Sequence, residues 1–297
     1  YLLNKVTVKT DDKAVSRSDL KKNIRQKPNT RILGVLRFHL GMYNLSGRNG
    51  EKRFNKWLRT IGEAPVVYND FHTQRSLAQL KLYLNNKGYY HASISDTVIY
   101  KNKKANVEYR ISPGKQTVIE EFGYRDKQDY VQNQLEDSTE LMQIVLADSV
   151  HSLLKTGKPL DMDLLESERE RVTRMLREKG YFNFSKNFIQ FYADTIQGQE
   201  VDKAHLLLSV IGNPADSSAY RKFRIGEINI NFDYDPLYLA SGADSSYVDT
   251  TYGGYGIIYR DKLKIKPKLI EETIQFKEGE LYNVQKVVDS YSRLQAL

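Results

Sequence analysis

One pattern of polar and apolar residues recurs along this chain: a turn, an amphipathic helix and an aromatic segment. In the clearest copy, apolar residues follow the turn at the spacing of one helix face, and a glycine then precedes two aromatic residues. The residues of this copy are Gly157, Pro159, Leu165, Arg171, Val172, Leu176, Gly180, Tyr181 and Phe182. The pattern predicts a helix that leads into the start of a strand.

Both ends of this helix carry their own signals. Asp163 can cap the first turn, while Glu166 can reach back to the backbone of the cap. Gly180 suits the left-handed residue that ends a helix. Asp161 and Asp163 are also spaced like a pair of ligands for a divalent ion, but capping accounts for them, so we expect no metal there.

The same pattern appears once before and once after this copy. The earlier copy contains Gly62, Leu77, Leu80, Leu84, Gly88 and Tyr89. The later copy contains Gly279, Val287 and Leu294, which align with Gly157, Leu165 and Val172. Repetition at a spacing of roughly a hundred residues favours tandem copies of one small domain.

The first copy, residues 1–114, reads as strand, helix, helix, strand, strand. Alternation from Leu2 to Val8 predicts a strand, and Ser16–Asp19 begins a short helix that we expect Pro28 to end. The helix over 73–87 and two strands around the polar turn 101–104 follow. Residues about 28–61 form an insertion whose charged helix carries Phe54, Trp57 and Leu58.

We expect the second and third copies at 115–214 and 221–297. In the second copy, strands are predicted over 117–124, 187–195 and 204–211, with a helix over 141–154. In the third copy, a strand over 223–232 precedes a Gly/Ser/Tyr-rich loop over 234–259, and no hairpin follows the last helix. The fold class is therefore α+β, with each three-stranded sheet covered on one face by two helices. We expect the third copy to be incomplete and the natural chain to continue.

Composition adds little about chemistry. The chain of 297 residues has no cysteine, so disulfides and thiolate catalysis are excluded, and its five histidines are scattered. Tyr252-Gly253-Gly254 lacks the residues of a phosphate loop and reads as an inserted loop. We expect no catalytic residue, no metal and no cofactor.

The formal net charge of +8 favours an acidic partner or an anionic lipid surface. Two basic clusters could contribute to such a contact: Lys101, Lys103 and Lys104, and Lys262, Lys264, Lys266 and Lys268. Aromatic residues do not accompany these lysines in a pattern that stacks on bases, so we expect no nucleic acid.

The repeated motif resembles the POTRA domain, the polypeptide-transport-associated repeat of the BamA/TamA superfamily of outer-membrane assembly proteins. The opening segment 1–6, with 26–29 and 43–45, looks like the Bacteroidota branch of that superfamily. The resemblance implies a non-enzymatic periplasmic arm attached to the outer membrane through a β-barrel of the same chain. It also implies partners, namely unfolded outer-membrane proteins and accessory lipoproteins.

A three-stranded sheet leaves an edge that an extended strand of another chain can complete. By the resemblance, this edge is the strand after the Gly-Tyr turn. The expected client-binding edges are 93–98 and 188–192, with Ser93, Ile94, Ser95, Val98, Phe188, Ile189, Phe191 and Tyr192. Alternate side chains, among them Ile94, Val98, Phe188 and Phe191, would tune client preference, and proline at Ser95 or Ile189 would disturb the edge without emptying the core.

Two alternatives stay open. One is the arm of a dedicated secretion transporter rather than of general outer-membrane assembly. The other is a periplasmic or secreted enzyme whose active residues lie in the insertions, over 41–56 or 234–260. A concave pocket with converging ionisable groups in either insertion would favour the enzyme.

Overall fold

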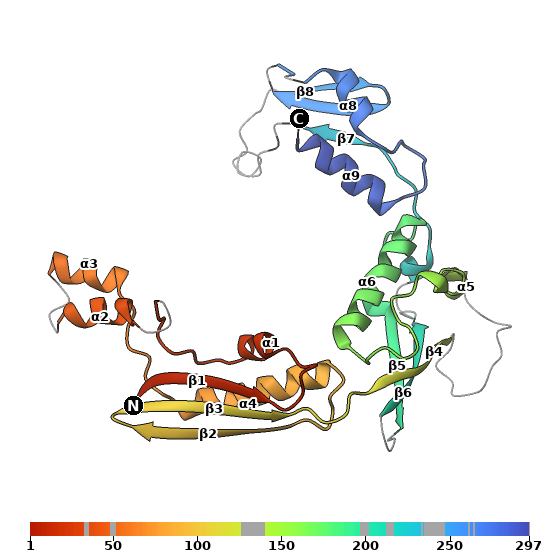
Figure 1. The fold of residues 1–297 in the computed structure, drawn as a ribbon. Coiled ribbons are helices and arrows are strands. Elements are labelled where there is room, and N and C mark those ends of the chain that lie inside the picture. The colour runs from red at the N-terminus through yellow and green to blue at the C-terminus, as the bar shows by residue number, and fades with distance from the viewer. Residues whose placement is uncertain are drawn as a thin grey trace. The chain divides into compact units, whose positions relative to one another are not determined.

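The computed structural model describes most of the chain and contains three separate three-stranded sheets (Figure 1). The described residues are 1–32, 36–47, 52–125, 140–196, 202–211, 217–232, 234, 247–260, 262–263 and 265–296. By their contacts they form two compact units, one of Tyr1–Glu121, Thr156–Leu164 and Asp194–His205, the other of Phe122–Lys155, Leu165–Ala193 and Leu206–Leu297. The division between the units runs through the second sheet, so the expected boundaries at 114 and 214 stay a prediction.

The first sheet has the order β1-β3-β2. Its strands are β1 (Leu2–Thr10), β2 (Ser93–Lys101) and β3 (Lys104–Ser112). β1 runs parallel to β3, and β2 pairs with β3 antiparallel. Asn102 and Lys103 join β2 to β3 with φ values of 51° and 57°, as a two-residue hairpin of mirror-image turn type requires. The predicted hairpin is confirmed.

Helices α1 (Arg17–Lys22) and α4 (Asp70–Asn86) cover one face of this sheet. Leu20 of α1 and Leu80 and Leu84 of α4 share one core with alternate residues of β3. Ser16 caps α1 as expected, but α1 ends at Lys22 rather than at Pro28. The reason is local, because the Asn23 side chain bonds the Asp19 carbonyl and the Asn23 N–H closes the last turn.

The second sheet has the order β4-β6-β5. Its strands are β4 (Val118–Arg125), β5 (Ile189–Ile196) and β6 (Lys203–Val210), and its helices are α5 (Glu140–Ala147) and α6 (Met162–Glu178). Short 3-10 turns span Ser149–His151, Lys186–Phe188 and Ser217–Tyr220. The helix predicted over 141–154 therefore stops at Ala147, and the strand predicted from 187 begins at Ile189.

The third sheet has the order β7-β9-β8, with β7 parallel and β8 antiparallel to β9. Its strands are β7 (Asn229–Asn231), β8 (Tyr247–Tyr252) and β9 (Tyr255–Arg260), and α8 (Pro267–Thr273) and α9 (Val284–Leu294) follow them. The prediction of a loop over 234–259 is thus wrong for residues 247–259, because these residues belong to the β8–β9 hairpin. Gly253 and Gly254, with φ of 61° and 86°, make its turn. The strand predicted over 223–232 shrinks to β7.

The burial expected for the repeated helices is confirmed at four positions. Leu80, Leu84, Val172 and Leu176 are all fully buried. Leu294 is only half-buried against the third core, so that prediction is wrong for α9.

The insertion in the first copy contains two helices, α2 (Phe38–Leu45) and α3 (Arg53–Ile61), and α3 confirms the predicted charged helix. The two helices pack on each other and project beyond the β1 end of the first sheet in Figure 1. Arg31 and Arg37 tie the insertion to the sheet by donating to the Asn4 carbonyl. Among the described residues, no helix is both long and apolar enough to cross a membrane.

Candidate functional site

β2 is an edge strand of the first sheet, as predicted. All nine of its residues pair with β3, from Ser93 opposite Ser112 to Lys101 opposite Lys104, without a register shift. Within the described part of the chain, β3 is its one neighbour in the sheet. Natural edges are usually shortened, bulged or interrupted by proline, and β2 has none of these features. Its outer side is therefore a long, regular row of backbone donors and acceptors.

The opposite edge of the same sheet is partly covered. Leu3 N–H donates to the Val66 carbonyl, and Tyr68 N–H donates to the Tyr1 carbonyl, at 2.8 Å each. β1 also carries a register irregularity between Leu3 and Lys5. Of the two edges of the first sheet, β2 is thus the one that a second strand can extend.

The side chains of β2 divide between the two faces of the sheet. Ile94 and Val98 are half-buried and pack against the helix-covered core. Ser93, Ser95, Thr97 and Ile99 are exposed. A strand added to this edge would therefore meet Ser95, Thr97 and Ile99 on the open face, while Ile94 and Val98 are already used by the core.

The second predicted edge, β5, differs from the expectation in two residues. Phe188 lies in a 3-10 turn before the strand and packs on Phe184, with ring centroids 5.7 Å apart. Ile189 is 1% exposed within the second core, so proline there would empty the core. Arginines lie over the next two rings, Arg169 at Phe191 and Arg125 at Tyr192. β5 is an edge by strand order, but its rings are partly covered.

The turn of the repeated motif has a structural role that the sequence did not reveal. In each copy, a short extended segment before the helix forms a bridge with a residue in, or shortly before, the first strand of its sheet. The bridges join Leu2 to Val67, Val118 to Pro159 and Arg224 to Leu281. Gly157 and Gly279 each lie two residues before the bridged residue of their copy. The residue at this position in the first copy is Pro65 and not Gly62. Gly62 instead ends α3, where a Cβ atom would lie 2.6 Å from the Tyr43 backbone nitrogen.

The residue two places after each bridge caps the following helix. Asn69 accepts from the Phe71 N–H, Asp161 from the Asp163 N–H, and Asn283 from the Lys286 N–H. The expected cap at Asp163 is therefore wrong by two residues. Glu166 does not reach back to the cap, because it pairs with Lys186 and Arg169.

Lys87, at the end of α4, uses both of the aspartates whose spacing resembles a metal site. Its Nζ atom lies 2.8 Å from Asp161 and 2.8 Å from Asp163. Burial alone would lower the pKa of Lys87, but its hydrogen bonds to the two carboxylates outweigh burial and raise that pKa. Asp161 and Asp163 thus bind an ammonium group of the preceding copy.

Glycine ends both long helices at a junction between copies. Gly88 and Gly180 have φ of 83° and 102°, as predicted for the left-handed end residue. The Gly88 carbonyl accepts from the Thr117 N–H at 2.8 Å, and the Gly180 carbonyl accepts from the Phe223 N–H at 2.9 Å. A Cβ atom at Gly88 would lie 2.9 Å from the Leu160 carbonyl oxygen. Tyr89 and Tyr181, the next residues, are buried in their own cores, whereas Phe182 is exposed and contacts Tyr282.

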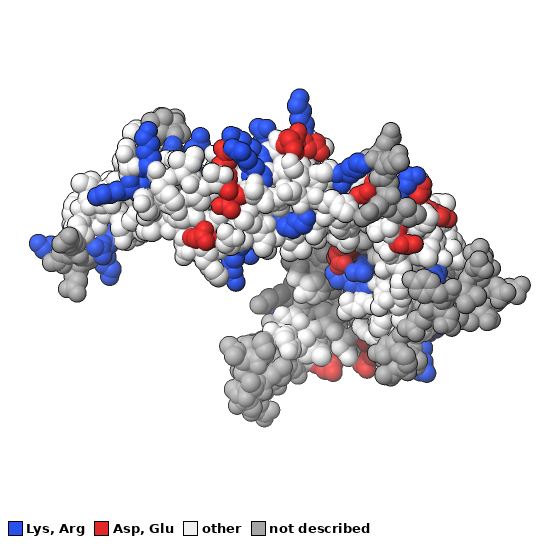
Figure 2. Space-filling model, turned by 90° about the horizontal axis from the view of Figure 1, so that it is seen from below, with Lys and Arg blue, Asp and Glu red and all other residues white. Residues whose placement is uncertain are grey.

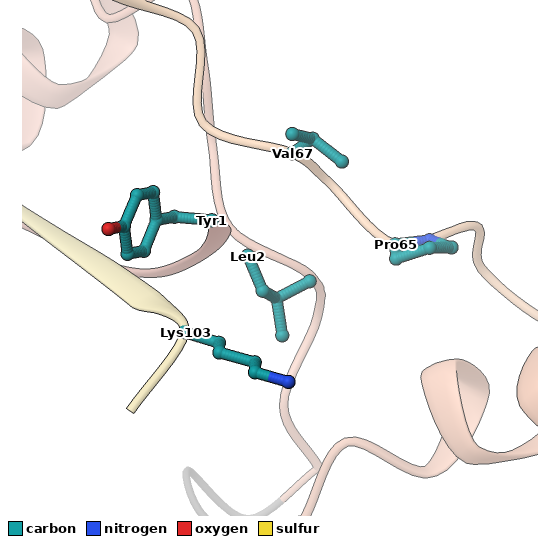
Figure 3. Close-up of a pocket in the computed structure, with 5 residues that line it drawn as sticks. All are labelled: Tyr1, Leu2, Pro65, Val67 and Lys103. Carbon is teal, nitrogen blue, oxygen red and sulfur yellow. The ribbon is translucent and has the colours of Figure 1, made fainter. Parts of the chain in front are cut away.

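A shallow pocket lies beside the first sheet, lined by Tyr1, Leu2, Pro65, Val67 and Lys103 (Figure 3). The lining holds no carboxylate and no histidine. No group of three or more metal-ligating side chains occurs within the residues that the structure describes. Lys264 of the second basic cluster and residues 48–51 of the insertion are not among the residues that the structure describes.

Part of the chain matches a known protein family. Residues 1–114 match the model of the POTRA family, described as a surface antigen variable number repeat. No curated protein matches the chain.

Solved structures similar to this chain include fragments of BamA and of Omp85. POTRA domains 3–5 of Haemophilus influenzae BamA are 14% identical, with 99% of this chain and 85% of that chain covered and a TM-score of 0.42. POTRA domains 1–3 of the periplasmic domain of Anabaena Omp85 are 11% identical, with 99% and 84% covered and a TM-score of 0.33. The N-terminal domain of Thermosynechococcus elongatus Omp85 is 10% identical, with 100% and 85% covered and a TM-score of 0.31. By the sequence match, residues 1–114 are similar to the POTRA family, and the second sheet repeats the strand order of the first.

Proposed function

We propose that this chain is a periplasmic arm of an outer-membrane protein assembly or translocation machine and binds extended segments of client proteins. The observation that carries this proposal is the open edge of β2, nine residues long and regular in register. Backbone pairing to such an edge tolerates many client sequences, because the affinity comes from main-chain hydrogen bonds. By its POTRA domain, the arm is attached to the outer membrane through a β-barrel of the same protein.

Two classes of partner fit this role: unfolded outer-membrane proteins at the edge of β2, and accessory lipoproteins elsewhere on the arm. The half-buried Ile94 and Val98 leave the client only the open face of β2, where Ser95 and Thr97 are small and polar. We therefore expect broad and weak binding of clients. β5 is a second, less open edge for the same purpose.

The test is site-specific photo-crosslinking from Thr97 to a peptide taken from a strand of an outer-membrane β-barrel protein. Successive backbone N–H groups of a strand point to opposite sides, so one of Ser95→Pro and Asp96→Pro removes a donor from the outer side of β2. The variant that keeps the native thermal unfolding profile is the informative one. We expect it to reduce crosslinking by about fivefold or more, since at least one backbone bond would be lost at about 1 kcal/mol.

The matched control is valine at the same position, Ser95→Val or Asp96→Val, because it changes the same side chain but keeps the N–H donor. It should crosslink as the parent chain does. Equal crosslinking by the proline and valine variants, or crosslinking that concentrates on α4 instead of β2, would contradict strand addition.

A further inference from the structure

The insertion that carries α2 and α3 holds most of the net charge of the chain. Residues 28–61 contain seven Lys or Arg and one Glu, a net charge of +6, whereas the whole chain has +8. Figure 2 shows Lys and Arg at the end of the molecule that carries these helices, with no Asp or Glu among the described residues on the face drawn there. This concentration marks the insertion as the part of the chain most attracted to an anionic surface.

The same insertion exposes large apolar side chains. In α3, Phe54, Trp57, Leu58 and Ile61 follow the spacing of one helix face. Leu58 is buried, but Phe54 is 66% exposed and Trp57 is 53% exposed, and their rings stack with centroids 5.9 Å apart. Leu45 at the end of α2 is also exposed, at 73%. An apolar face of this size needs a partner, because water does not favour it.

The start of each helix is basic and uncapped. Arg37 precedes α2 and Lys52 precedes α3, neither helix has an acidic residue in its first turn, and neither N-cap side chain bonds the backbone. The positive end of a helix favours anions, so these cations add to an unfavourable charge. Lys52, Arg53 and Lys56 are exposed and make no ion pair with any residue that the structure describes. They are available to an external anion.

We propose that the α2–α3 insertion docks the arm on the surface of an anionic phospholipid bilayer. A basic helix with tryptophan, phenylalanine and leucine on its other face fits the boundary between headgroups and acyl chains. A nucleic acid would use aromatic rings for stacking but would gain nothing from Leu45. An acidic protein would use the cations but would need its own apolar groove for Phe54 and Trp57.

The chain supplies its own probe, because Trp57 is its one tryptophan. The experiment adds vesicles to the 297-residue chain and follows the tryptophan emission maximum and its quenching by brominated lipid. Vesicles of phosphatidylcholine with phosphatidylglycerol should shift the emission to the blue and allow quenching. Vesicles of phosphatidylcholine alone should bind at least tenfold more weakly.

Two variants separate charge from apolar contact. Lys52→Gln with Lys56→Gln should weaken binding to anionic vesicles by about tenfold or more, since each cation near such a surface contributes about 1 kcal/mol. Phe54→Ser should weaken it by about tenfold through lost apolar burial. The control is Lys13→Gln with Lys21→Gln, which removes the same charge from exposed positions outside the insertion and outside both basic clusters, and should bind as the parent chain does.

Four results would overturn the proposal: no emission shift with either vesicle, equal affinity for neutral and anionic vesicles, equal loss in the control variant, or an emission shift caused by polyglutamate or RNA but not by vesicles. Circular dichroism checks that each variant unfolds at the parent temperature. The helices α2 and α3 lie outside the cores of the sheets, so we expect these exposed substitutions to keep the fold.

Discussion

At the scale of single residues, the two junctions between copies of the repeated motif differ in their ion pairs. Lys87 is 29% exposed and bonds two carboxylates of the next copy, whereas Lys179, at the equivalent place in the second copy, makes no ion pair with a described residue. The corresponding contact there is neutral, because Asn283 donates to the Glu178 carbonyl at 3.0 Å. The two junctions therefore share backbone geometry but differ in charge.

Replacing Lys87 by Met should loosen the first junction. The pair is partly exposed, so we expect a loss of about 1 kcal/mol, which corresponds to about fivefold faster amide exchange at Thr117 and Leu160. The Thr117 amide bonds the Gly88 carbonyl across the junction, and the Leu160 amide bonds the Thr117 carbonyl beside it. Lys179→Met is the matched control and should leave exchange at Phe223 and Tyr282 unchanged. Similar acceleration in both variants would show that the charge of Lys87 has no special part.

Glu168 should make the second core sensitive to acid. Its side chain is fully buried and accepts from the Leu153 N–H and from Arg171, which also pairs with Asp148. Burial alone would raise the pKa of Glu168. The hydrogen bonds that its carboxylate accepts, first of all from Arg171, outweigh burial and hold this pKa below its ordinary value of 4.5. A lowered folded-state pKa stabilises the fold above pH 4.5, and this stability is lost as the pH falls through the lowered value.

We therefore expect Glu168→Gln to cost about 2 kcal/mol at neutral pH, measured by calorimetric unfolding. The difference from the parent chain should vanish at a pH below the lowered pKa. Glu170→Gln is the control on the same helix, since Glu170 is exposed and should cost little. A loss that is constant across this pH range would mean that packing, and not the carboxylate charge, stabilises this site.

At the scale of elements, much of the fold could be predicted from the sequence, because the helices and strands obey local rules. The helix end at Gly88 and the hairpin after Tyr100 follow from residue spacing, whereas the edge position of β2 was implied by the family resemblance. The β8–β9 hairpin was missed, because glycine, serine and tyrosine around Gly253 and Gly254 read as a loop. The equivalence of Pro65 to Gly157 and the pairing of Lys87 depend on contacts between distant segments, which periodicity does not report.

The hairpin between β2 and β3 uses a poor turn residue. Lys103 is left-handed at φ 57°, a conformation that costs a side chain about 1 kcal/mol and that glycine adopts freely. Lys103→Gly should therefore raise the stability of the first sheet by about 0.5–1 kcal/mol, measured by thermal unfolding. Lys104→Gly, one residue later at the start of β3, should lower it. The opposite order of the two variants would show that the turn has another conformation in solution.

At the scale of the whole molecule, charge and strand edges are separated along the chain. The open β2 edge and the basic α2–α3 insertion belong to the same unit, yet the edge carries only Asp96 and Lys101 as charged residues over its length. Client pairing at this edge would depend weakly on salt, whereas lipid docking by the insertion would depend strongly on it. The two activities can therefore be measured independently in one chain.

The carbonyls of Gly88 and Gly180 accept from the chain that follows them, and both contacts use backbone atoms alone. The genetic consequence is that a copy can be gained or lost with its junction intact. An in-frame deletion from Tyr89 through Gly180 would join Gly88 directly to Tyr181. The Gly88 carbonyl would then take the place of the Gly180 carbonyl as the acceptor for the Phe223 N–H. A duplication of the same stretch would add a copy with both contacts in place, so the length of the arm can change in evolution by whole units without prior adaptation of either neighbour.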